Sequence, residues 1–251
     1  VFSADSFMSH LAWIVFVYYI SVWSLVSTLL VYITRQLHFT TVELGWLMTG
    51  YGVSTVFSEA VLVRIIVPRI GENNSIRLGL ASFAAQCVVV GISTNSQWIF
   101  ISVGFSMLAN LVYPSISSLV SKVVDEDIQG EALGALNGIK ALTEGFGPLF
   151  FGLLMALFEN TPDPGAPYIL CAMLAFWAFL HCFELPSEPE DAMVEFKKDR
   201  SRRRHHRHHS TEADGLLSAE DLLDRNEDDS DLDFDFDAIY SDDESIDNFR
   251  L

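Results

Sequence analysis

Apolar residues fill six stretches among the first 185 positions, and each stretch is about as long as a membrane-spanning helix. A bilayer core of ~30 Å requires about 20 predominantly apolar residues in a helix. None of the stretches alternates apolar and polar residues as a strand of an outer-membrane barrel would, so helices are expected. The expected spans are 10–33, 44–67, 76–93, 98–120, 132–158 and 168–185. The pattern predicts an all-α membrane protein with a six-transmembrane-helix bundle over residues 1–185.

The hydrophobic pattern stops at Pro186, and like charges then occur in blocks up to Leu251. Such composition predicts a disordered tail over residues 186–251. The tail holds 21 of the 33 acidic residues, so it accounts for most of the formal net charge of −18. Residue 1 is Val, and no Lys or Arg precedes the first span. We therefore expect no secretory signal and expect the sequence to be a piece of a longer chain.

The three cysteines all lie in apolar stretches. Their odd number and their spacing suit neither a disulfide framework nor a zinc site, so we expect small packed side chains and neither a metal nor a cofactor. They are Cys87, Cys171 and Cys182.

Basic residues predict which side of the membrane each loop occupies. The loops expected on one side of the membrane contain Arg35 as their one basic residue. Those on the other side contain several basic residues, and the block 197–209 follows the last span. Those in the loops are Arg64, Arg69, Arg77 and Lys122. Cytoplasmic loops are enriched in Lys and Arg, so we expect the richer side and the tail in the cytoplasm. The block 197–209 either binds anionic membrane lipid or acts only as a topological signal.

Three ionisable residues fall deep inside predicted spans, where each costs ~2.5–3.5 kcal/mol on insertion scales. Lys140 and Glu144 are one helical turn apart, so they share a face about 6 Å apart along the axis. They either neutralise each other as an ion pair or line a watery cavity and act in substrate binding or protonation. Glu59 likewise has two interpretations: it takes part in proton coupling, or it packs as a pair with Arg64.

Two amides and a glycine-rich segment add weaker signals. Asn110 and Asn137 lie in the fourth and fifth spans, where hydrogen bonds between helices account for most such residues. In the fifth span, Pro148 predicts a kink because proline lacks an amide hydrogen and clashes with the preceding turn. Its neighbours in the kink are Gly145 and Gly147. Three further glycines recur every four residues and predict close packing of a neighbouring helix: Gly130, Gly134 and Gly138.

Two segments resemble the major facilitator superfamily over roughly residues 11–185. The loop at 64–79 resembles the degenerate second copy of the basic, glycine-containing loop that these transporters carry after the second helix of each half. The residues that match are Arg64, Arg69, Gly71 and Arg77. The segment 113–148 resembles the C-terminal half of the tetracycline-resistance-like branch and is similar to the eukaryotic hippocampus abundant transcript group.

The resemblance implies that the spans are helices seven to twelve of a twelve-helix transporter. The N-terminal six-helix half, missing from this chain, would form the other wall of the substrate cavity. Two six-helix bundles would rock around a site near the midplane, and the loop at 64–79 would latch helices on the cytoplasmic side. In bacterial relatives proton antiport drives this cycle.

The tail contains an acidic dileucine pattern, Glu212, Leu216 and Leu217. It predicts a sorting adaptor as partner and an endosomal, lysosomal or vacuolar membrane in preference to the plasma membrane. The six preceding spans argue against a nuclear role for the basic block, so no nucleic-acid partner is expected.

The leading hypothesis is a secondary active transporter of a small solute. The candidate substrate and proton-pathway groups are Lys140, Glu144, Glu59, Asn137 and Asn110. The alternative is a transport-inactive membrane receptor or trafficking adaptor that acts through its tail. No nucleophile-and-base or phosphate-cradling motif is found, so an enzyme is not expected.

Overall fold

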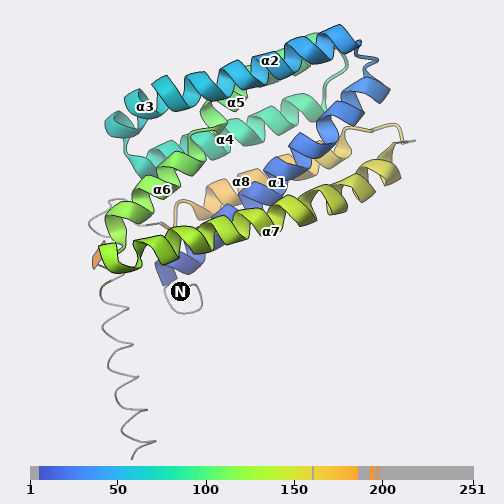
Figure 1. Ribbon diagram of the computed structural model, residues 1–251. Coiled ribbons are helices and arrows are strands. Elements are labelled where there is room, and N and C mark those ends of the chain that lie inside the picture. The colour runs from blue at the N-terminus through green and yellow to red at the C-terminus, as the bar shows by residue number, and fades with distance from the viewer. Residues whose placement is uncertain (1–5, 160, 186–192, 195–196, 198–251) are drawn as a thin grey trace, which may run out of the picture. The chain divides into compact units, whose positions relative to one another are not determined.

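A computed structural model of the chain describes residues 6–159, 161–185, 193–194 and 197. These residues are nearly all helical, and the helices run side by side as a bundle (Figure 1). In chain order the elements are α1 (Ser6–Gln36), α2 (Thr41–Phe57), the π-helical turn η1 (Ser58–Leu62), α3 (Val63–Ile70), α4 (Glu72–Gly91), α5 (Ser96–Ala109), α6 (Val112–Val123), α7 (Glu126–Phe158) and α8 (Ala166–His181). The sorting pattern at Glu212, Leu216 and Leu217 lies outside the described residues.

The helices coincide with the predicted spans. One continuous helical stretch, α2 to α3, covers the second span, and α5 with α6 covers the fourth. Three stretches are long and apolar enough to cross a membrane, Phe7–Gln36, Ser96–Val123 and Glu126–Phe158. Ala166–His181 is apolar but shorter. The all-helical expectation is confirmed for the described residues, whereas six membrane crossings stay a prediction.

Local sequence explains where the helices begin and break. Thr40 and Glu43 form a reciprocal capping box at the start of α2. Gly71 separates α3 from α4 with φ of +83°, a backbone conformation that residues with a Cβ rarely adopt. The break between α5 and α6 precedes Pro114, which has no amide hydrogen to donate to the carbonyl group of Asn110.

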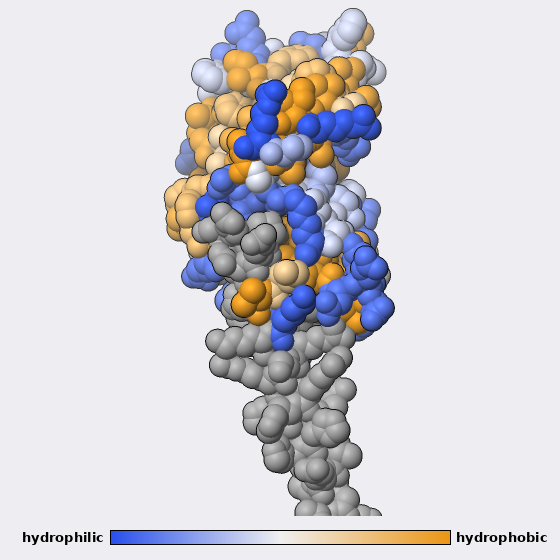
Figure 2. Space-filling model, turned by 90° about the vertical axis from the view of Figure 1, so that its left-hand side faces the viewer, coloured by the Kyte–Doolittle hydropathy of each residue, from blue (hydrophilic) through white to orange (hydrophobic). Residues whose placement is uncertain are grey.

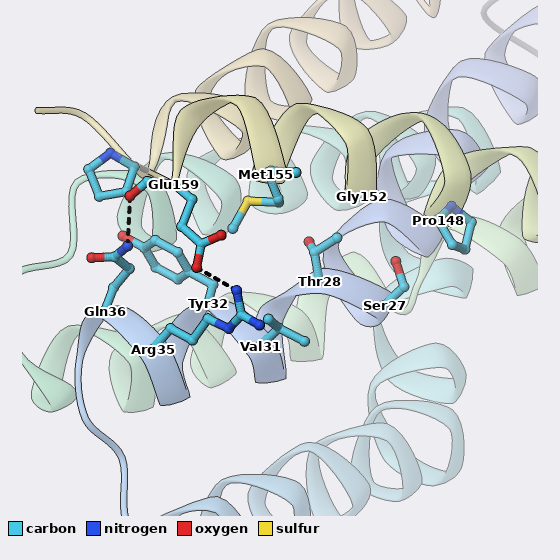
Figure 3. A pocket seen from close by; sticks show the side chains of 12 residues that line it. Ser27, Thr28, Val31, Tyr32, Arg35, Gln36, Pro148, Gly152, Met155 and Glu159 are labelled. Carbon is cyan, nitrogen blue, oxygen red and sulfur yellow. Dashed lines mark hydrogen bonds and ion pairs between the residues drawn. The ribbon is translucent and has the colours of Figure 1, made fainter. Parts of the chain in front are cut away.

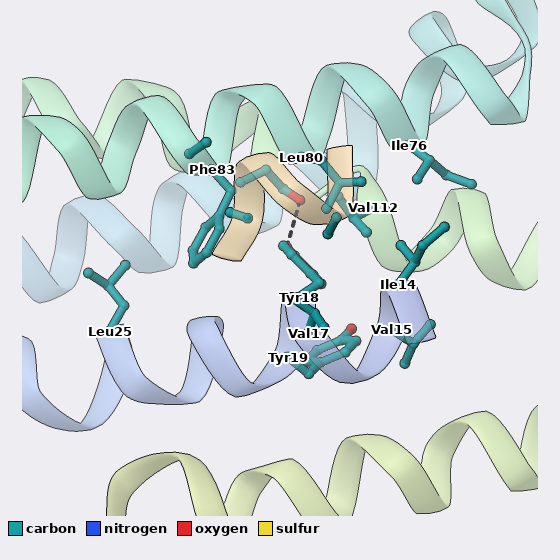
Figure 4. Close-up of a cluster of buried hydrophobic side chains, with 14 of the residues drawn as sticks. Ile14, Val15, Val17, Tyr18, Tyr19, Leu25, Ile76, Leu80, Phe83 and Val112 are labelled. Atoms are coloured by element: carbon teal, nitrogen blue, oxygen red, sulfur yellow. Dashed lines mark hydrogen bonds between the residues drawn. The ribbon is translucent and has the colours of Figure 1, made fainter. Parts of the chain in front are cut away.

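The core forms where α1 packs against α7 and α8 and where α4 packs against α5, α6 and α8. Figure 4 shows Ile14 and Tyr18 of α1 opposite Leu80 and Phe83 of α4. The Tyr18 hydroxyl donates to the carbonyl oxygen of Ala109 at 3.1 Å, so a buried polar group has its partner. The three cysteines are buried and free.

Two glycines bring α4 and α8 into backbone contact. A Cβ added to Gly165 would lie only 1.9 Å from the carbonyl oxygen of Gly91. A Cβ on Gly91 would lie 2.7 Å from Ile169 Cδ1. This junction therefore requires residues without a side chain at both positions.

Helix α7 runs from Glu126 to Phe158 with Gly145, Gly147 and Pro148 inside it, and the kink expected at these residues stays a prediction. It departs from one expectation: the described helices do not make the close packing predicted for the glycine stripe, since a Cβ at any of its three positions would meet no atom within 4 Å. The reason is that α7 packs on α1 through another face, where a Cβ on Gly147 would lie 3.1 Å from the Ile20 carbonyl oxygen. The three stripe positions are Gly130, Gly134 and Gly138.

Large apolar side chains remain exposed on the two helices at the margins of the bundle. On α7 they are Leu142, Phe146, Leu149, Phe150, Leu153 and Leu157. On α2 they are Val42, Trp46, Met48, Val53, Val56 and Phe57. Water does not favour such surfaces, so lipid or further protein is expected against both helices.

Candidate functional site

A cavity of about 330 Å³ opens between α1, α2, α4 and α5. One part of its wall is apolar and includes Tyr18, Leu25 and Phe83, which Figure 4 shows between α1 and α4. The other part is polar and is formed by Tyr51, Thr55, Gln86, Ser106 and Asn110. Cavities of this size, mostly apolar with a few placed polar groups, are typical of small-molecule sites.

Hydrogen bonds fix the polar wall. Gln86 is 2% exposed and donates from Nε2 to the Tyr51 hydroxyl at 3.1 Å. Asn110 donates from Nδ2 to Thr55 Oγ1 at 3.2 Å. Because Tyr51 and Thr55 are one turn apart on α2, the two amides of α4 and of the α5–α6 break meet one face of that helix.

Lys140 lies at the junction of α1, α6 and α7, beside two aromatic rings. Its Nζ atom is 4.6 Å from the centre of the Tyr113 ring and 5.2 Å from that of Tyr19. The Tyr113 hydroxyl in turn donates to Asn137 Oδ1 at 2.8 Å. A cation over the faces of tyrosine rings is stabilised by their quadrupoles. The Tyr19 ring also packs against the Tyr18 ring, with the two centroids 5.1 Å apart, so this cluster borders the part of the cavity wall that Tyr18 forms, although Lys140 is not itself in the lining.

Of the five candidate residues, Asn110 lines the cavity and the other four lie outside its lining. Asn137 and Lys140 come together around Tyr113. Glu144 is exposed, and the ion pairs of the described residues include none between it and Lys140. The intrahelical pair considered from the sequence is therefore not formed.

Glu59 is exposed within the π-helical turn η1, and no ion pair joins it to Arg64 within the described residues. The neighbouring Ser58 hydroxyl donates to the carbonyl oxygen of Met107 at 2.6 Å, which ties η1 to α5. π-Helical turns occur frequently at functional sites. Hydrophobic periodicity alone could not indicate this turn.

In the loop expected to act as a cytoplasmic latch, Arg77 contacts the residues that follow α8. Arg77 donates from Nη2 to the carbonyl oxygen of Cys182 at 3.3 Å, and its guanidinium carbon lies 4.4 Å from the centre of the Phe183 ring. Arg64 and Arg69 are exposed. Figure 2 views the end of the bundle where α3, the end of α6 and the start of α7 lie, and hydrophilic side chains gather there.

A buried acidic residue at this end was missed from the sequence. Glu72 is 7% exposed and pairs with Lys122 at the end of α6, while Ser118 Oγ donates to the same carboxylate at 3.1 Å. Burial alone would raise the pKa of Glu72. Hydrogen bonds from Lys122, from its own backbone amide and from Ser118 outweigh burial and lower the pKa below its ordinary value. The position of Glu72 directly after the positive-φ Gly71 was the available signal.

A second ion pair joins α1 and α7 at the opposite end. Arg35 pairs with Glu159, and Gln36 Nε2 donates to the Glu159 carbonyl oxygen at 3.3 Å, as Figure 3 shows. A cavity of about 290 Å³ lies beside them, between Thr28 on α1 and Gly152 on α7. From the sequence Arg35 served only as a marker of topology. Within the described residues, no group of three or more His, Cys, Asp or Glu side chains could hold a metal ion.

The family model described as Major Facilitator Superfamily matches residues 11–218. The chain belongs to this superfamily. It is 23% identical to the mouse (Mus musculus) Hippocampus abundant transcript 1 protein over 88% of this chain and 50% of that protein. It is 23% identical to the human (Homo sapiens) Hippocampus abundant transcript-like protein 1 over 64% of this chain and 35% of that protein. The Escherichia coli Tetracycline resistance protein, class C, is 25% identical over 52% of this chain and 33% of its own length.

The chain spans about half, or less, of the length of these curated relatives. Membership of the superfamily, together with long apolar helices, indicates an integral membrane protein of a transporter family. It favours transport over catalysis and over the alternative of a transport-inactive receptor or adaptor.

Proposed function

We propose that this chain is the C-terminal half of a secondary active transporter that moves a small solute across a membrane by alternating access. The observation that carries the proposal is the cavity of about 330 Å³, whose fixed polar wall lies among otherwise apolar helices. The exposed apolar faces of α2 and α7 flank the bundle, and a preceding six-helix half would cover part of them and close the cavity.

The same proposal fixes the topology. All six helical stretches cross the membrane, and the end with Arg64, Arg69 and Lys122 lies in the cytoplasm together with the tail, because basic residues are enriched on that side. The dileucine pattern directs the protein, through a sorting adaptor, to an endosomal, lysosomal or vacuolar membrane.

The candidate residues divide into two roles. Asn110 contacts the solute, because it lines the cavity. Lys140, Glu144, Asn137 and Glu59 belong to a proton pathway that couples transport to a proton gradient. Two features support this division: Lys140 lacks a carboxylate partner within the described residues, and both glutamates are exposed on helices of the bundle.

Alternating access can be tested before the solute is known. Met48 lines the cavity and is 42% exposed, so Met48→Cys places a reporter thiol there. The variant would be made in the full-length protein and treated with a membrane-impermeant maleimide, in right-side-out and in inside-out vesicles. A transporter exposes the reporter to both sides, and labelling follows from each.

The buried native cysteines make the protein without the reporter a suitable blank. Labelling from one side only, under all conditions, would contradict alternating access. Deletion of residues 187–251 gives a second arm: a transporter keeps two-sided labelling and changes its location, whereas an adaptor working through its tail loses its function.

A further inference from the structure

The cavity between α1, α2, α4 and α5 has no charged wall. Among the described residues that line it, none is Asp, Glu, Lys, Arg or His. The charged candidate residues lie outside the lining: Lys140 is beside Tyr19, whose ring packs behind that of Tyr18, and Glu59 and Glu144 do not line the cavity. A charged solute would lose water here without gaining an opposite charge, which is unfavourable.

The polar wall nevertheless has hydrogen-bonding capacity left over. Gln86 and Asn110 each use an amide NH₂ group, toward Tyr51 and Thr55 respectively. Their carbonyl oxygens, Oε1 and Oδ1, accept no hydrogen bond from any described residue. Neither oxygen is among the fully buried side-chain atoms that lack a partner, so both are open to donors from outside the described chain.

The opposite wall offers only apolar contact. Leu25, Leu29 and Met48 line it together with the ring of Phe83. A solute that fills a cavity of about 330 Å³ would therefore have one apolar side and one side with hydroxyl or amide donors.

We propose that this cavity selects a neutral, amphipathic solute that donates hydrogen bonds to Gln86 Oε1 and Asn110 Oδ1 and places its apolar side against Leu25 and Phe83. The assignment rests on the proposed transport function and names the substrate class of its site. Anions and cations of the same size are rejected because nothing in the lining neutralises them.

The test uses the Met48→Cys reporter in the full-length protein and three probes with one skeleton. They are para-(hydroxymethyl)benzamide, which is neutral, para-(hydroxymethyl)benzoate, which is an anion, and para-(hydroxymethyl)benzylamine, which is a cation. The neutral probe should slow maleimide labelling of the reporter about threefold at a concentration of twice its dissociation constant, since labelling requires the empty site. The two charged probes should leave the rate unchanged at that concentration.

Asn110→Asp introduces a carboxylate of nearly the same shape into the cavity. The cationic probe should then protect best, and the neutral probe should lose its advantage. The matched control is Asn95→Asp, the same change at the exposed N-cap of α5 outside the cavity, which should keep the original order.

The outcomes separate the two proposals. Two-sided labelling with no protection by the neutral probe, or with equal protection by a charged one, overturns the neutral-solute assignment and leaves alternating access intact. One-sided labelling overturns the transport proposal whatever the probes do. An unchanged probe order in Asn110→Asp also overturns the assignment, because the added charge would then lie outside the binding site.

Discussion

The Lys140 ammonium group lies 4.6 Å from the centre of the Tyr113 ring and makes no ion pair with Glu144 among the described residues. The ring is held in place because its hydroxyl donates to Asn137, one turn before Lys140 on α7. Tyr19 of α1 contributes a second face. A charge within a membrane span is thus supported by two aromatic rings from neighbouring helices instead of by the acidic residue nearest in sequence.

Replacing Tyr113 should separate the contribution of its ring from that of its hydroxyl. Tyr113→Phe keeps the ring over Lys140 and loses the bond to Asn137, which should cost about 1 kcal/mol. Tyr113→Leu loses both and should cost about 1 kcal/mol more, because the cation–π contact disappears. Thermal unfolding of the full-length protein in detergent measures both variants, and equal losses would show that the ring does not stabilise Lys140.

The pair of Glu72 and Lys122 should make the basic end sensitive to acid. The folded-state pKa of Glu72 is depressed, so its contribution to stability is present above the ordinary value of 4.5 and is lost as the pH falls through the lower folded value. Lys122→Met leaves a buried carboxylate without its cation, and burial then favours a raised pKa, so this variant should be least stable at neutral pH and should recover stability as the pH falls and Glu72 takes up a proton.

At neutral pH, Lys122→Met should destabilise by about 1–3 kcal/mol, between the values for exposed and buried ion pairs. The matched double variant Glu72→Gln with Lys122→Met removes both charges and should recover part of this loss. Unfolding midpoints measured from pH 7 down to pH 4 test the pair. A Lys122→Met protein with the pH profile of the parent would contradict the role given to Glu72.

The ion pair of Arg35 and Glu159 should contribute far less. Their side chains are 61% and 37% exposed, so water screens the attraction. A double-mutant cycle with Arg35→Gln and Glu159→Gln should give a coupling of at most about 1 kcal/mol. A coupling well above this limit would mean that the end of α1 and α7 is dehydrated in the whole protein.

The helices could be predicted because a chain that spans lipid must satisfy its backbone hydrogen bonds internally, which leaves only helices and closed barrels. Apolar runs of membrane-spanning length in the sequence fall on helices in the structure, with α1 extending past both ends of its predicted span and α7 beginning six residues before its own. The breaks within helices were harder to predict. Proline at position 114 is a residue type that disturbs a helix, but no residue types mark the π-helical turn at Ser58–Leu62. Such a turn depends on tertiary contacts such as that of Ser58 with Met107.

The site was predictable in part only. Asn110 was identified as a polar residue in an apolar span, and it lines the cavity. Gln86 and Tyr51 were not proposed, because a single amide or phenol in a helix is most often explained by a hydrogen bond to another helix. Which side chains share a cavity depends on how α1, α2, α4 and α5 are placed together, and periodicity within one helix does not contain that information.

Replacement of glycine by alanine should have opposite effects on stability at Gly165 and at Gly134. Gly165→Ala places a Cβ 1.9 Å from the Gly91 carbonyl oxygen, so α8 must move and the loss should reach about 3 kcal/mol. Gly134→Ala meets nothing within 4 Å, so within this chain it should be neutral or slightly stabilising, as alanine favours helix over glycine by about 1 kcal/mol.

Comparing Gly134→Ala in two contexts tests whether another half packs on α7. In a chain limited to residues 1–251, unfolding in detergent should be unaffected. In the full-length protein the added methyl group should lower the unfolding midpoint if a helix of the other half approaches Gly130, Gly134 and Gly138, because a close backbone contact would be forced apart. An unchanged midpoint in both contexts, with Gly165→Ala destabilising in each, would show that the stripe faces lipid.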